Sequence, residues 1–188
     1  MRPQTILLAL LIADAAMMAV FVAVPFIAPS GTALGLDGSV GTIDHPDIWY
    51  DMDLFSGSVY ALGDFLCHQE EARSFILGDN QMPVCIRDFS LMIGAAVGLA
   101  LCYWRYADVS AMGRNEVLVC LVLFALTPAE WALEGATGWD IWYIRAVISV
   151  VSAMAFVALL TKYVGQGLES VIGRVSERSQ VLVKLPFM

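Results

Sequence analysis

The fold is decided by a long apolar stretch near the start of the chain, residues 5–28, TILLALLIADAAMMAVFVAVPFIA. At about 1.5 Å per residue, a helix of this length reaches roughly 36 Å and can cross the hydrocarbon core of a bilayer. Arg2 before an apolar stretch is also typical of a signal peptide, but we expect a membrane helix. Asp14 lies about halfway along it, and such an intramembrane acid is either functional or a protonated or capped structural residue.

The composition of the whole chain agrees with a membrane protein. Of its 188 residues, 59% are hydrophobic and only 15% are charged, whereas soluble domains carry about 25% charged residues. The formal net charge of −8 and the lack of a basic patch exclude nucleic acid as a partner, because phosphate would be repelled. Only Lys162 and Lys184 are lysines, and an acidic, lysine-poor composition resembles that of halophilic archaea.

Three further apolar segments are expected to cross the membrane, at residues 89–106, 117–133 and 140–163. Gly94 and Gly98 lie one helical turn apart, a small-residue spacing that permits close helix packing. Pro128 is expected to kink its helix, because proline removes a backbone donor. The predicted fold is therefore all-α, an integral membrane helical bundle of four transmembrane helices.

The segment between the first two spans is expected to lie outside the bilayer core. Residues 29–55 are rich in Gly and Asp and are predicted to form a polar loop, with Trp49 and Tyr50 as membrane-interface anchors. Residues 56–75 show helical spacing but are too short to cross, which predicts a short surface or re-entrant helix. One face of that helix would carry Asp64, Cys67, His68 and Glu71.

The basic residues predict the orientation of the chain. With four spans, one side of the membrane receives Arg2, Arg105, Arg114, Lys162, Arg174, Arg178 and Lys184. Since basic loops are usually cytoplasmic, both the N- and the C-terminus are predicted to be cytoplasmic in a multi-pass protein of the cell membrane. Residues 1–164 then form a single membrane domain, followed by an amphipathic cytoplasmic tail at 165–188. The outer side receives residues 29–88 and the connection 130–140.

Short motifs on the outer side resemble a known family. They are Cys67-His68-Gln69, Arg73-Ser74-Phe75, Gln81, and Pro83-Val84-Cys85 with Arg87. Together they resemble the signature of small, uncharacterised predicted integral membrane proteins of archaea and bacteria. That family typically shows an acidic residue and a Gln one helical turn apart at the end of one span, and an Arg that opens the next. Glu130, Glu134 and Arg145 resemble these positions. The resemblance covers about residues 60–160 and implies a membrane protein without implying an activity. Many members read Cys-x-Arg-Cys where this chain ends the motif with Asp88.

Three kinds of chemistry are open to Cys67, His68, Cys85 and Asp88. Two sulfurs, one nitrogen and one oxygen can surround zinc tetrahedrally, with Asp64 or Glu71 in place of Asp88, although adjacent side chains on a helix diverge by about 100°. A Cys67–Cys85 disulfide is the second possibility, favoured by an oxidising outer compartment. The third is a reactive thiol pair with His68 as base. Cys102 and Cys120, in the spans, are expected to be buried as small apolar residues.

Charged residues at the outer edge of the bilayer form a second group. The predicted polar pocket consists of Arg73, Arg87, Glu130, Glu134, Asp140 and Arg145. Charges at this depth have to be paired or to line a cavity. They would either hold the bundle together or bind an anionic head group through arginine forks.

Three functions follow from these patterns. The first is a polar outer-face pocket that binds a metal ion, with zinc the expected cofactor, or a lipid or anionic ligand, without turnover. The second is a metal- or thiol-dependent hydrolase, transferase or oxidoreductase that acts on a lipid or quinone, with His68 or Glu134 as catalytic base. The third is a disulfide-stabilised assembly subunit. Membrane lipids are the expected partners, together with a membrane protein or a second copy of the chain.

Overall fold

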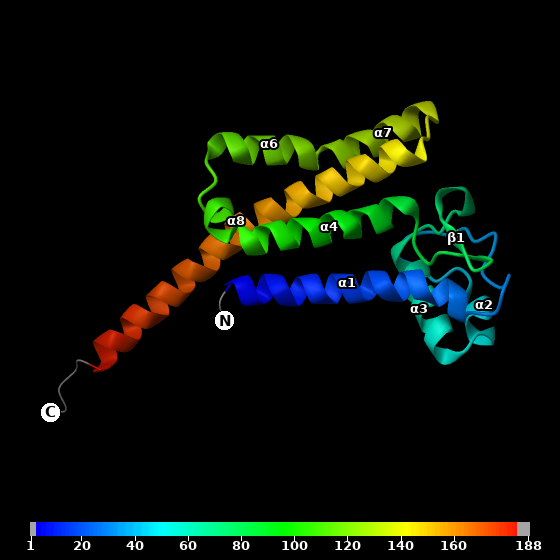
Figure 1. The fold of residues 1–188 in the computed structure, drawn as a ribbon, viewed down its shortest axis with the longest axis horizontal. Helices are drawn as coiled ribbons and strands as arrows, with labels where there is room; N and C mark the ends of the chain where they lie inside the picture. The colour runs from blue at the N-terminus through cyan, green and yellow to red at the C-terminus, as the bar shows by residue number, and fades with distance from the viewer. Residues whose placement is uncertain (1–2, 184–188) are drawn as a thin grey trace.

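The computed structural model describes the backbone of residues 3–183 and the side chains of residues 3–167. In this part of the chain, four helical segments are long and apolar enough to cross a membrane. They are α1 (Pro3–Ile27), α4 (Ile86–Trp104), the pair α6 (Arg114–Phe124) and α7 (Leu126–Thr137), and the first part of α8 (Trp142–Val183). The all-α bundle of four transmembrane helices is therefore confirmed (Figure 1).

The four spans pack side by side around α4 and α8, which form the most extensive helix pair (Figure 1). A Cβ on Gly94 of α4 would lie 2.3 Å from the Val150 carbonyl oxygen of α8, and one on Gly98 would lie 3.1 Å from the Cα of Met154. The two helices therefore approach through the small-residue spacing seen in the sequence. α1 packs on the other side of α4, and α6 and α7 pack on α8.

The third span is interrupted where Pro128 predicts a kink. α6 ends at Phe124 and α7 begins at Leu126, so that Pro128 lies in the first turn of α7. Proline has no N–H for the carbonyl four residues earlier, which belongs to Phe124. The Ser152 hydroxyl of α8 donates a hydrogen bond of 2.7 Å to that carbonyl and satisfies it.

The helix that contains the fourth span is longer than the predicted span of 140–163. α8 runs without a break from Trp142 to Val183, so the same helix continues through residues 165–183 of the predicted tail. The side chains that would make this tail amphipathic lie outside the described residues. Near residue 163, Lys162 is almost buried and its Nζ donates to the Met112 carbonyl, beyond the end of the short helix α5 (Tyr106–Ser110).

The segment between α1 and α4, residues 28–85, folds into a compact unit that we call the head. It contains α2 (Pro46–Asp51), α3 (Leu54–Leu66), a 3-10 turn η1 (Glu71–Arg73) and a hairpin of β1 (Ile76–Leu77) and β2 (Asn80–Gln81), which pair antiparallel. The head lies at one end of the bundle, and the N-terminus and α5 lie at the other (Figure 1). It has an apolar core of its own, joined to the end of α1 through Phe21 and Val24.

Two expectations for the head are wrong. Trp49 is not a membrane-interface anchor: it is buried, stacks on Tyr60 with ring centroids 5.2 Å apart, and lies in a helix rather than a loop. The predicted helix over residues 56–75 begins at Leu54 and ends at Leu66, after which Cys67 is extended and Gln69 has a positive φ of 50°. Cys67 therefore shares no helical face with His68 and Glu71.

Candidate functional site

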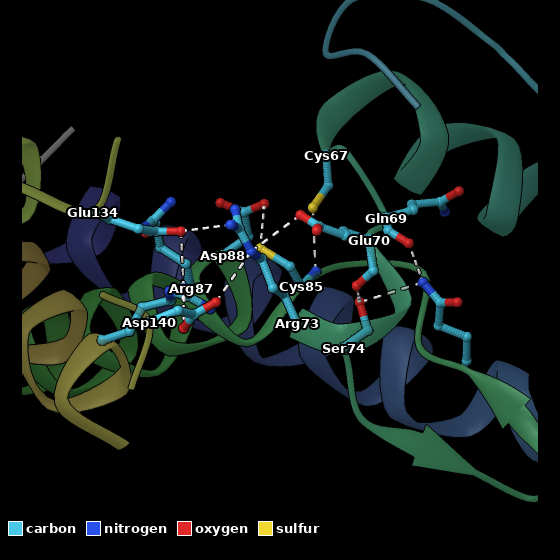
Figure 2. A network of polar contacts seen from close by, with 12 residues as sticks. Cys67, Gln69, Glu70, Arg73, Ser74, Cys85, Arg87, Asp88, Glu134 and Asp140 are labelled. Carbon is cyan, nitrogen blue, oxygen red and sulfur yellow. Dashed lines mark hydrogen bonds and ion pairs between the residues drawn. The ribbon is translucent and has the colours of Figure 1, made fainter. Parts of the chain in front are cut away.

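The two cysteines of the head lie close together because the end of α3 lies beside the start of α4. Cys67 follows the last residue of α3, Cys85 precedes the first residue of α4, and Asp88 lies in the first turn of α4. The ligand atoms of these three residues all lie within 4.8 Å of one another. Figure 2 shows the two sulfur atoms and the Asp88 carboxylate gathered beside a cluster of arginines.

Glycine and glutamine residues bring the two helix ends together. A Cβ on Gly63, one turn before Cys67, would lie 2.3 Å from the Pro83 carbonyl oxygen, so only glycine allows the segment before Cys85 to approach α3 this closely. The buried side-chain amide of Gln69 donates 2.9 Å to the same Pro83 carbonyl and 3.4 Å to that of Tyr60. These contacts hold the backbone on both sides of the thiol pair.

Both thiols are free in the structure, which therefore contains no disulfide between Cys67 and Cys85, one of the three possibilities for this pair. Cys67 is buried, and its sulfur accepts a hydrogen bond of 3.2 Å from the backbone N–H of Cys85. The Cys85 sulfur lies 3.3 Å from Asp88 Oδ2. A hydrogen bond to Cys85, together with burial, raises the pKa of the Cys67 thiol. The same contact lowers the pKa of the Cys85 thiol, because the Cys67 S–H stabilises its thiolate.

The other predicted ligands lie apart from the thiols. His68 is exposed and is not part of the group of three, since successive side chains of an extended segment point to opposite sides. It does line the same cavity, of about 160 Å³, with both cysteines and Asp88. Asp64 is fully buried, and its Oδ2 accepts from Trp49 Nε1 at 2.8 Å. Glu71 is exposed in η1.

Three arginines that line this cavity, Arg73, Arg87 and Arg145, belong to a network of charged side chains. Glu134 is the central residue of the network. Its carboxylate contacts Nη2 of Arg73 at 2.7 Å, of Arg87 at 2.5 Å and of Arg145 at 3.1 Å. Both Glu134 and Arg145 are buried. Because Arg73 comes from the head and the other residues from α4, α7 and α8, the network joins the head to three helices (Figure 2).

Further carboxylates complete the pairing of the three arginines. Arg87 Nη2 also contacts Glu130 at 2.9 Å, and Arg73 Nε contacts Glu70 at 3.0 Å and Asp140 at 3.3 Å. Arg145 is paired with Asp140 as well. The hydrogen bond from Arg145 and the positive charges nearby lower the pKa of the Asp140 carboxyl. The six residues predicted as a polar pocket therefore lie together, and they are largely paired with one another.

The net charge of the protein is concentrated in the segment that contains the head. Residues 29–88 contain ten of the 18 acidic residues and two of the ten basic residues, which accounts for the whole formal charge of −8. The rest of the chain contains eight residues of each sign and is balanced. A net negative charge raises the local concentration of cations and repels anions.

The buried amides of the head were not among the site residues expected from the sequence. Gln81 accepts from the Leu36 N–H at 3.2 Å and donates to the Gln69 carbonyl, while Asn80 donates to the Pro25 carbonyl of α1 at 3.0 Å. These residues attach the loop, the hairpin and α1 to the segment that carries Cys67. Gln69 and Gln81 did have a sequence signal, because both belong to the motifs that carry the family resemblance, whereas Asn80 had none.

Outside the head, the remaining candidates are separate from the site. Cys102 is buried, and Cys120 is partly buried; both line a cavity of about 730 Å³ between α4, α6 and α8. The buried Oδ2 of Asp14 accepts no hydrogen bond from the described residues. Neither location brings three metal-ligating groups together within the part of the chain that the structure describes.

The fold and this geometry define a class: a multi-pass helical membrane protein with a thiol–carboxylate cluster between a small head and the bundle. Residues 67–159, just under half of the chain, match a family described as "Predicted membrane protein (DUF2085)". The match begins at Cys67 and includes the cluster and the charged network, so it supports assignment to a family of membrane proteins. Comparison with curated proteins and with solved structures gives no match.

Proposed function

We propose that this membrane protein binds a divalent metal ion, zinc by preference, through Cys67, Cys85 and Asp88. The observation that carries the proposal is the convergence of two sulfurs and a carboxylate oxygen within 4.8 Å. Thiolates and carboxylates are both zinc ligands, and two sulfurs favour zinc over magnesium or calcium.

The separation of the ligand atoms fits a metal of this size. Zinc–sulfur and zinc–oxygen bonds of about 2.3 and 2.1 Å, at the tetrahedral angle, separate the two ligand atoms by about 3.6 Å. The observed separation of Cys85 Sγ and Asp88 Oδ2 is 3.3 Å. Small side-chain movements would therefore be enough to close the shell around the ion.

The charges around the cavity favour binding of a cation over binding of an anionic ligand, which is the other kind of ligand expected from the sequence. The three arginines of the cavity are engaged by Glu70, Glu130, Glu134 and Asp140, so they offer little free charge to a phosphate or carboxylate. The head supplies the whole net charge of −8. A metal ion binds cysteine as the thiolate, and its positive charge would also compensate the negative charges of the two thiolates.

The resemblance noted for the motif agrees with a metal site. Relatives with Cys at position 88 would offer a third thiolate, and Asp88 offers a carboxylate in the same place. Both groups are anionic metal ligands, whereas a carboxylate cannot form a disulfide. Three protein ligands would leave the fourth coordination position of zinc open to the cavity. The exposed side chain of His68 lines the same cavity.

Metal analysis of the intact protein tests the proposal. The chain is purified in detergent without chelator and under reducing conditions, loaded with zinc and desalted, and we expect about one zinc per chain by elemental mass spectrometry. Cys85→Ser and Asp88→Ala should lose most of it. Cys102→Ser, which removes a buried thiol away from the cluster, is the matched control and should retain it.

Thiol titration separates the alternatives. Four reactive thiols after unfolding, with no retained zinc, would contradict the metal site. Two thiols without reductant and four with it would show that Cys67 and Cys85 form a disulfide instead, and would also contradict it.

A further inference from the structure

The short helix α3 has the reverse polarity of a helix on a water-soluble surface. Its outward face carries five large apolar residues with exposed fractions of 38–89%, namely Leu54, Phe55, Leu62, Phe65 and Leu66. Its buried residues are Ser56, Gly57, Val59, Tyr60, Gly63 and Asp64, of which only Val59 is aliphatic. Helices in water bury the apolar side, so this arrangement indicates an apolar environment around α3.

The outward apolar residues form one continuous strip. At about 100° per residue, the five side chains and the intervening Ser58 and Ala61 fall within roughly 140° of the helix circumference. None of these positions carries a charge. A contiguous uncharged face of this kind on the surface of a protein marks an interaction site.

The strip lies next to a membrane-spanning helix. α3 packs beside the end of α1 (Figure 1), and α1 exposes Val22, Phe26 and Ile27 near that end, with exposed fractions of 38–63%. A bilayer around α1 would therefore reach the region of α3, and it is the apolar environment nearest to the strip.

A hollow on the same side of α3 has room for part of a lipid. It lies between α2 and α3, has a volume of about 370 Å³, and is lined mainly by apolar residues that include Tyr50, Leu54 and Ala61. Tyr50 and Leu54 are nearly fully exposed, at 88% and 89%. Tyrosine is typical of the interface between hydrocarbon and water.

Acidic residues limit how far the helix can enter. Asp47 and Asp51 of α2 and Asp53, which caps α3, are exposed at one end of the strip. Thirteen residues of helix reach only about 20 Å, which is too short to cross the hydrocarbon core. The helix can therefore lie in the interface with these carboxylates in water.

We infer that α3 is an interfacial helix embedded in the leaflet at the head end of the bundle, with lipid acyl chains as its partner. The inference does not depend on the metal site. It has a consequence for that site, because Cys67 directly follows α3 and the cavity would then open close to the lipid head groups.

Photolabelling in a bilayer tests this inference on the unmodified chain. The protein is reconstituted into liposomes that contain a phosphatidylcholine with a diazirine in its acyl chain, irradiated, and mapped by peptide mass spectrometry. We expect adducts on residues 54–66 at a level close to that on exposed α6 residues such as Val119 and Val122, and few on the head loop 35–39, which does not line the hollow. Labelling of 54–66 no higher than that of the loop, with α6 labelled, would overturn it.

A pair of variants tests the residues of the strip. Leu62→Asp places a charge on the strip and should reduce the labelling of α3 several-fold. Leu34→Asp changes a head residue of similar exposure outside α3 and should leave it unchanged. Cross-links from α3 to a second copy of the chain, in place of lipid adducts, would identify a dimer surface and would also overturn the inference.

Discussion

Arg145 and Glu134, both nearly inaccessible to solvent, are joined at 3.1 Å where the head meets the bundle. The same carboxylate contacts Arg73 and Arg87, so one acidic side chain from α7 balances guanidinium groups from three other elements. Removal of this carboxylate would leave buried positive charges without their main partner.

Glu134→Gln is therefore expected to lower the stability by about 3–5 kcal/mol, the usual cost of breaking a buried ion pair by removing one partner. Thermal unfolding in detergent, followed by circular dichroism, measures the change. Glu116→Gln removes an exposed carboxylate at the other end of the third span and is the control. An equal effect of the two substitutions would mean that the network contributes no more than a surface charge.

Acid should weaken the same junction through Asp140. Its pKa is lowered in the folded protein by Arg145, so it remains ionised at a pH where the unfolded carboxyl, with an ordinary pKa near 3.9, is protonated. Its contribution is fully present above about pH 4 and is lost as the pH falls through the folded pKa. Asp140→Asn should lower the melting temperature at pH 6 and have a smaller effect at pH 3. A constant difference across this range would argue against the ion pair.

The two thiols of the metal-free protein should react unequally. The lowered pKa of Cys85 increases its thiolate fraction at neutral pH, and the raised pKa of Cys67 reduces it. Since the thiolate is the reactive form, iodoacetamide should alkylate Cys85 faster than Cys67. Mass spectrometry of the Cys67 and Cys85 peptides gives both rates. The difference should vanish in guanidinium chloride, and equal rates in the folded protein would contradict the assigned hydrogen bond.

Helix packing predicts opposite results for two glycines. Gly94→Ala would bring a methyl group within 2.3 Å of the Val150 carbonyl, so α4 and α8 would have to separate, at a cost of about 1–3 kcal/mol. A Cβ on Gly135 in α7 meets nothing within 4 Å, and Gly135→Ala should leave stability unchanged or increase it by up to about 1 kcal/mol. Thermal unfolding of both variants provides the comparison, and a stable Gly94→Ala protein would disprove close packing at this position.

Local features of the sequence were sufficient for the bundle. Each span is recognised from its own length and apolar content, and these do not depend on which helix lies beside it. The break near Pro128 also follows locally, because proline cannot donate to the Phe124 carbonyl. What the sequence could not provide was the partner of that carbonyl, Ser152, which comes from a different helix.

The interior of the head depended on contacts between distant residues. Helical spacing continues past Cys67 in the sequence, but α3 ends at Leu66, where Gln69 bonds to the Pro83 carbonyl instead of continuing the helix. The direction of Asp64 was mistaken for the same reason, because its side chain is held by Trp49 of α2.

The sequence by itself determined that the chain is a four-helix membrane protein, and it identified the cysteines and charged residues of the site. Only the tertiary structure decided that Cys67, Cys85 and Asp88 meet without His68, and that Glu134 balances three arginines. The physical reason is the range of the interactions. Hydrophobic length acts within one segment, whereas ligand groups and ion pairs come together only when separate helix ends pack against one another.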